Sequence, residues 1–139
     1  MERPLAVAGS ISGVNGVLIW TANFEPMLRF YRDVLGLPPR SVKDGFVNFA
    51  WGDFRLSVAV HSQVEGASRD PLRIMVNFAV DDIHAVHRRL ADAGVEFSRP
   101  PEQESWGGWV ATFHDPDGNT LQLLQTRGTT GPPPAGYPA

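Results

Sequence analysis

Residues 106–125, WGGWVATFHDPDGNTLQLLQ, decide the fold of this chain because they describe two β-strands joined by a tight turn. The turn is DPDG at positions 115–118. Its proline presets the first corner, its first aspartate can accept backbone N–H groups, and its glycine tolerates a positive dihedral angle. After the turn, Leu121 and Leu123 alternate with Gln122, which is the period of a strand. One face of this strand therefore belongs to a core, and the other is free for a function.

A resemblance to a known family rests on this hairpin and on a second segment. GWVATFHDPDGNTLQLLQ resembles the closing hairpin of the vicinal oxygen chelate superfamily, which includes glyoxalases, extradiol dioxygenases, fosfomycin-inactivating enzymes and bleomycin-binding resistance proteins. FYRDVLGL, within residues 23–37, resembles the first helix of the same superfamily. The resemblance spans residues 12–126. It implies a fold rather than an activity, since members of this fold perform unrelated chemistry.

Composition limits the classes of protein. A chain of 139 residues, 42% apolar and 19% charged, can bury one ordinary core, so we expect a single domain. The net charge of -3 argues against nucleic acid as a partner. The absence of cysteine excludes disulfides and thiolate chemistry. The apolar run at residues 5–8 is too short for a signal peptide or membrane span, so we expect a cytoplasmic protein with no membrane partner.

The first half of the chain predicts one helix and four strands. A strand over residues 13–21 precedes a helix that begins at Asn23, a good N-cap, and stops at Gly36. Apolar residues at helical spacing form its buried stripe. Three short strands are expected after it, at residues 40–43, 46–51 and 54–61. Gly52-Asp53 between the last two is a two-residue hairpin signal.

The second half repeats this order. A strand over residues 72–80 precedes a helix that begins at Asp81 or Asp82 and stops at Gly94. Adding 59 to the numbers of the first helix stripe gives the apolar positions of the second helix. Further strands are expected at 95–98, 109–114 and 120–125.

These elements predict an α+β fold in which two βαβββ modules form a curved mixed sheet around a cavity, with the helices on the outer face. The glyoxalase-like domain is expected over residues 12–126, with modules at about 12–61 and 72–126. Residues 1–11 are expected to be an N-terminal arm. Residues 127–139 have the proline- and glycine-rich composition of a disordered tail.

The resemblance also implies where a metal would sit. In the metal-dependent members, four ligands, mostly His and Glu, lie on the first and last strands of each module. The matching positions in this chain are Gly16, Ser57, Met75 and Gln122. A missing side chain, a soft thioether, a hydroxyl and one amide cannot replace imidazoles and carboxylates around a divalent ion. We therefore expect no metal and no other cofactor.

Alternation along the strands predicts a binding site in the cavity. If Ser57 faces the cavity, then Arg55 and His61 face it too, while the apolar residues between them face the helices. The alternative is that Asn77 and Gln122 only satisfy neighbouring backbone groups in a filled barrel. Nine residues make up the predicted site, with the mixture of apolar walls and polar groups typical of small-molecule pockets: Leu18, Trp20, Arg55, Ser57, His61, Met75, Asn77, Gln122 and Leu124.

A small-molecule-binding protein is the slightly favoured function, because it needs no catalytic set. The metal-free resistance members suggest this class. Trp20 shares the parity of the cavity, and Trp51, Trp106 and Trp109 stand at strand ends that could form a rim. Tryptophan surfaces pair well with planar or aromatic molecules. Arg55 could pair with an acidic or carbonyl-bearing group of the ligand.

An enzyme is the main alternative. In one version it is metal-free, and His61 or Arg55 handles proton or anion chemistry. In another it is a metal-dependent lyase, isomerase or dioxygenase whose ligands lie at other positions. An interaction protein without a ligand is supported only by the lack of a chemical signature. The resemblance also implies a homodimer, since members of this superfamily commonly complete their cavity with a second pair of modules.

Overall fold

The computed structural model describes residues 9–126. The predicted tail at 127–139 lies outside them, as does most of the predicted arm. None of the helices in this described part is long and apolar enough to cross a membrane. In chain order the elements are β1 (Gly16–Thr21), α1 (Phe24–Leu28), its π-helical continuation η1 (Arg29–Val34), β2 (Pro39–Lys43), β3 (Phe46–Trp51), β4 (Phe54–Val60), β5 (Met75–Ala79), α2 (Ile83–Asp92), β6 (Phe97–Gln103), β7 (Trp109–His114) and β8 (Thr120–Gln125).

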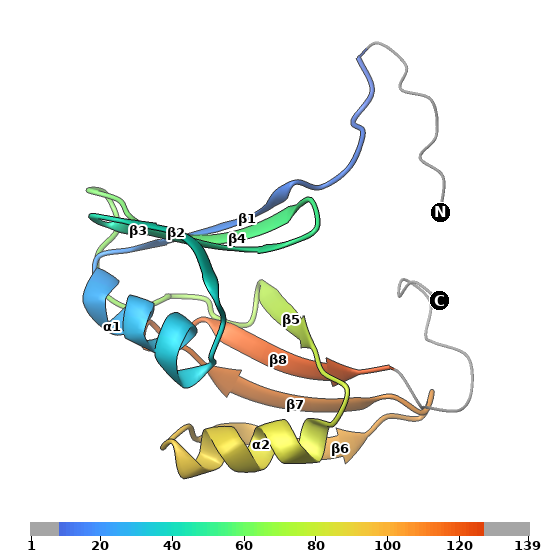
Figure 1. Ribbon diagram of the computed structural model, residues 1–139. Helices are drawn as coiled ribbons and strands as arrows, with labels where there is room; N and C mark the ends of the chain where they lie inside the picture. Colours follow the sequence, from blue (N-terminus) through green and yellow to red (C-terminus); the bar gives the residue numbers. More distant parts are fainter. Residues whose placement is uncertain (1–8, 127–139) are drawn as a thin grey trace.

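The strands form two four-stranded sheets (Figure 1). Sheet A has the order β1-β4-β3-β2, and sheet B has the order β5-β8-β7-β6. In each sheet the first strand of the module pairs parallel with the last, and the other pairs are antiparallel. This repeated connectivity confirms the α+β fold of two βαβββ modules. The predicted sheet is divided in two, because β1 and β5 each pair with only one strand within residues 9–126.

Both sheets turn one face toward a single core. Leu56 and Val58 of β4 and Leu121 and Leu123 of β8 are buried, as their alternation predicts. The buried stripes of α1–η1 and α2 join the same cluster. We call the sheet faces that meet this core the helix-facing faces and the opposite ones the open faces. Figure 1 shows α1 beneath sheet A and α2 against sheet B.

The N-terminus of α2 is capped by two side chains. The carboxylate of Asp82 accepts the N–H of Ala85 at 3.1 Å, as expected of an N-cap aspartate. The side-chain oxygen of Gln125 accepts the N–H of Ile83 at 2.8 Å. The last strand of the second module therefore holds the start of its helix.

The first helix differs from the prediction in its cap and its geometry. Asn23 stands at the N-cap position but makes no side-chain cap bond. Its own N–H donates to the hydroxyl of Thr21 at 2.8 Å. The helix continues in π geometry, with the N–H of Leu35 bonded to the carbonyl of Phe30 at 2.8 Å. The apolar pattern fits either helix type, so it predicts the element and its end at Gly36, where φ is 76°, but not the wider turn.

The turn of the last hairpin joins the two modules. Asp115, which is only 5% exposed, accepts the backbone N–H groups of Asp117 and Asn119 at 3.0 Å and the Asn119 amide at 2.9 Å. Its fourth donor is the hydroxyl of Tyr31, at 2.6 Å, which belongs to the first module. The hydroxyl of Thr21, at the end of β1, donates to the buried carboxylate of Asp117 at 2.6 Å. We call these two links the module joint.

Burial changes the pKa values of Asp115 and Tyr31 in the module joint. It raises the pKa of Asp115, and the hydrogen bonds from Tyr31, Asn119 and the backbone oppose this effect. Burial, with the nearby Asp115 carboxylate, also raises the pKa of Tyr31 well above its usual range, so the phenol stays protonated and donates. The raised pKa of Asp115 means that the folded state holds this proton more tightly than the unfolded state. The contribution of Asp115 to stability is therefore greatest below its unfolded pKa and falls as pH rises through the folded pKa.

Replacing Tyr31 by Phe tests the module joint. We expect the free energy of unfolding, measured by urea titration, to fall by about 1–3 kcal/mol, because a buried carboxylate loses a donor. The control is Ser62→Ala, which removes an exposed hydroxyl and should change stability by less than about 0.5 kcal/mol. Equal effects of the two substitutions would contradict a structural role for this hydrogen bond.

Candidate functional site

Five predicted site residues gather on or next to the open face of sheet A. Leu18 and Trp20 come from β1, Arg55 and Ser57 come from β4, and Leu18 stands opposite Ser57 in the parallel pair. Leu18 is 43% exposed and Trp20 is 44% exposed, so both residues remain partly open to solvent. His61 directly follows β4, and its ring packs edge-on against the Trp20 indole with centroids 4.8 Å apart. This contact positions a half-exposed aromatic surface.

The two candidate catalytic side chains are partly engaged by the backbone. Nδ1 of His61 accepts the N–H of Gln63 at 3.0 Å, so a neutral imidazole carries its proton at Nε2. Nη1 of Arg55 donates to the carbonyls of Gly52 at 2.9 Å and Phe54 at 3.4 Å, which ties this guanidinium to the β3–β4 hairpin. Their roles in catalysis or in anchoring a ligand stay predictions.

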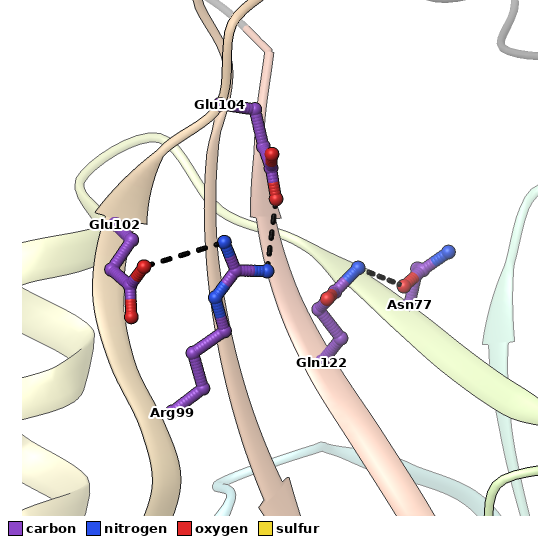
Figure 2. A network of polar contacts seen from close by, with 5 residues as sticks. All are labelled: Asn77, Arg99, Glu102, Glu104 and Gln122. Carbon is purple, nitrogen blue, oxygen red and sulfur yellow. Dashed lines mark hydrogen bonds and ion pairs between the residues drawn. The ribbon is translucent and has the colours of Figure 1, made fainter.

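The other four predicted residues share the open face of sheet B. Met75 and Asn77 lie on β5, and Gln122 and Leu124 lie on β8. Gln122 is only 7% exposed, and its amide donates to the side-chain oxygen of Asn77 at 2.9 Å (Figure 2). These two amides therefore bond to each other across adjacent strands. Met75, 39% exposed, provides an apolar neighbour at the start of β5.

Sequence reasoning missed the continuation of the polar row on sheet A. Asn48 stands opposite both Ser57 and Ser41, so the open face carries polar side chains on β4, β3 and β2. The side-chain oxygen of Asn48 is buried and has no hydrogen-bond partner within residues 9–126. A polar residue between the buried Val47 and Phe49 was the available signal. A buried acceptor without a partner among these residues calls for a donor from beyond them, such as water or a ligand.

Sheet B carries a matching row with charged neighbours. Thr112 stands opposite Gln122, and Arg99 stands opposite Thr112. Figure 2 shows the Arg99 guanidinium between two carboxylates, with Glu104 at 2.8 Å and Glu102 at 3.5 Å. The hydrogen bond to Glu104 contributes most to the raised pKa of Arg99. Two carboxylates around one guanidinium leave this edge with one excess negative charge.

The expected tryptophan rim is wrong for two of its three members. Trp51 follows the alternation of β3 onto the helix-facing side, and Trp109 packs against the core with its ring centroid 4.9 Å from that of His84 on α2. Trp106 covers Gly108, where any Cβ would overlap the indole. The face onto which a residue at a strand end points depends on where the strand begins. The alternation of apolar and polar residues defines that first residue poorly. Trp20 thus lies on an open face, whereas Trp51 and Trp109 do not.

Comparison with models of protein families tests the family resemblance that the last hairpin and the first helix suggest. The model of the Glyoxalase/Bleomycin resistance protein/Dioxygenase superfamily matches residues 13–123. The chain belongs to this superfamily. It is 26% identical over 115 residues to the protein YraH of Bacillus subtilis (strain 168), covering 74% of this chain and 90% of that one.

Solved structures agree on the fold. A glyoxalase/bleomycin resistance protein/dioxygenase from Nocardioides superposes with a TM-score of 0.68 and 20% identity, covering 95% of this chain and 93% of that chain. A glyoxalase-related enzyme from Fulvimarina pelagi gives a TM-score of 0.69 and 21% identity, covering 84% and 89%. Identities this low establish a shared fold and no shared activity.

The residues present do not fit the metal that some superfamily members bind. A Cβ at Gly16 would overlap the carbonyl oxygen of Arg55, so no ligating side chain fits at that position. Ser57, Met75 and Gln122 offer a hydroxyl, a thioether and one amide oxygen. Residues 9–126 contain no group of three or more His, Asp or Glu side chains placed to hold an ion.

Metal analysis of the purified protein tests this conclusion. We expect less than about a tenth of an equivalent of Zn, Ni, Mn or Fe after dialysis, because these ions need borderline or hard donors that the four positions lack. Elemental analysis by mass spectrometry gives the stoichiometry. A full equivalent of any of these ions that survives dialysis would overturn it.

Proposed function

We propose that the protein binds a planar or aromatic small molecule, without a metal, against the open face of sheet A. The observation that carries this proposal is Trp20, an indole that is 44% exposed and yet positioned by the His61 ring. Exposed tryptophan offers a large flat apolar surface that stacks well on conjugated rings. Leu18, 43% exposed on the same face, extends that surface.

Polar groups around this surface support an oriented ligand. Asn48 holds a buried side-chain oxygen that lacks a donor within residues 9–126, and Ser57 lies between Asn48 and Leu18 in the same row. The remaining N–H groups of Arg55 can pair with an acidic or carbonyl group. Apolar walls with a few polar groups of this kind are typical of small-molecule sites.

We further propose that a second copy of the chain completes the site. Both open faces carry uncovered apolar side chains, among them Leu18, Trp20 and Met75. In the described chain β1 and β5 are sheet edges, which leave backbone groups available for pairing. Apposition of sheet A of one copy with sheet B of another would enclose a ligand between Trp20 and the Asn77–Gln122 pair.

Trp20→Ala tests the ligand wall. In calorimetric titrations with aromatic acids, aromatic amines and aromatic antibiotics, we expect it to weaken binding by roughly 1–3 kcal/mol, the value of burying a large side chain. Trp51→Ala is the matched control for the aromatic amines of the panel, because Trp51 is 47% exposed but lies on the helix-facing side, away from the open face.

Met27→Ala, in the core stripe, should instead lower stability by about 2–5 kcal/mol. If no compound of the panel binds, and Trp20→Ala unfolds the protein as Met27→Ala does, then Trp20 is a structural residue and the proposed site fails.

Light scattering at tens of micromolar protein tests the dimer. We expect twice the mass of the chain, and we expect Leu18→Glu to shift the protein toward the monomer, because a charge would be buried in the interface. Val42→Glu is the control. Val42 is 46% exposed and lies on the helix-facing side of sheet A, so this substitution should leave the mass unchanged. A monomeric mass for the unmodified protein would count against the dimer.

A further inference from the structure

A cavity of about 530 Å³ lies between the helices and the helix-facing faces of the sheets, and it reaches Asn77 and Ala79 of the edge strand β5. Both modules line it. The end of the first helix contributes Leu35, the β3–β4 hairpin contributes Trp51 and Phe54, and β5 contributes Val76 and Phe78. Its volume falls within the roughly 300–1,000 Å³ of ordinary ligand sites. The cavity is therefore large enough for an organic molecule and shares no wall with the exposed Trp20 surface.

Among residues 9–126, Arg89 of α2 is the one charged residue that lines this cavity. Its Nη1 donates to the carbonyl of Val34 at 3.0 Å, and its Nη2 donates to that of Leu35 at 3.1 Å. These bonds hold the guanidinium over the end of the first helix. An arginine has five N–H donors, so three remain for another partner. No carboxylate within residues 9–126 forms an ion pair with Arg89.

We propose that this cavity is a second ligand site, which takes a medium-chain carboxylic acid. Branched and aromatic side chains surround the alkyl chain, and the carboxylate pairs with the free N–H groups of Arg89. An apolar lining with a single cation selects an amphiphile of this kind, because the alkyl chain gains from burial and the guanidinium matches a carboxylate in geometry and charge. Apart from Asn77 of β5, which also belongs to the open face of sheet B, this site uses the helix-facing faces of the sheets and shares no residue with the Trp20 surface, so it does not depend on the proposed function.

A head-group series on the unmodified protein tests the charge of the ligand. Decanoate, decan-1-ol and decylamine are titrated below their aggregation concentrations and followed by calorimetry. Decanoate should bind roughly tenfold or more tightly than decan-1-ol, the ratio expected for charge-assisted hydrogen bonds, and decylamine should bind most weakly. Equal affinities, or no saturable binding of decanoate, would overturn the proposal.

Substitutions then locate the site. Arg89→Met should weaken decanoate binding roughly tenfold or more and leave decan-1-ol unchanged. Arg88→Met, one residue earlier and outside the cavity lining, is the matched control. Val86→Trp, which fills the cavity from α2, should weaken both compounds. If Arg89→Met does not fold, the head-group series decides alone.

Trp20→Ala separates this site from the proposed one. This substitution should leave the affinity for decanoate unchanged even if it abolishes the binding of aromatic compounds. The two proposed sites can therefore be refuted independently of each other. Decanoate binding that disappears with Trp20→Ala would assign the compound to the open face and overturn the cavity site. Release of a second copy by decanoate in light scattering would also overturn it, because the cavity would then be an interface between copies.

Discussion

The module joint is the interaction on which the rest of the structure depends. It links Asp115 to Tyr31 and Asp117 to Thr21 across 84 and 96 residues of sequence. Both carboxylates are almost completely buried. If the modules moved apart, each carboxylate would lose a hydrogen-bond donor, which is costly for a buried charged group. The fixed hydrogen-bond geometry therefore sets how the last hairpin of one module meets the first helix of the other. This placement creates the single core that both sheets share.

A shared core also determines which faces are available for a ligand. Since both sheets turn their alternate residues Leu56, Val58, Leu121 and Leu123 inward, the residues between them are left on the open faces. On sheet A, the close approach of β1 to β4 leaves no room for a side chain at Gly16, the position where the family resemblance implies a metal ligand. The pairing of β1 with β4 thus leaves no side chain at position 16, and the inward turn of the core residues leaves Leu18 and Trp20 on the surface.

Much of the fold could be predicted from the sequence, because its signals are local. The DPDG turn, the two helix stripes and the alternation within single strands all survive in the structure. Relations between strands could not be predicted. Arg99 joins its polar row only through the register of β6–β7, and Asn48 meets Ser41 only through that of β2–β3. Both pairs contain register shifts. Trp51 and Trp109 were misplaced because the facing of a strand end requires the exact first residue.

The cavity beside Arg89 could not be predicted from the sequence for a related reason, because its walls come from elements that are distant in sequence. Residues of strand β5 contribute both to this cavity and to the open face of sheet B. Its Val76 and Phe78 pack toward the core and the cavity, while Asn77 between them bonds to Gln122 on the open side. As an edge strand, β5 is held by β8 alone within the described residues. This strand of five residues therefore borders both candidate sites. The period of two directs Val76 and Phe78 toward the cavity, whereas Asn77, which bonds to Gln122 on the open side, also lines the cavity and is shared by the two sites.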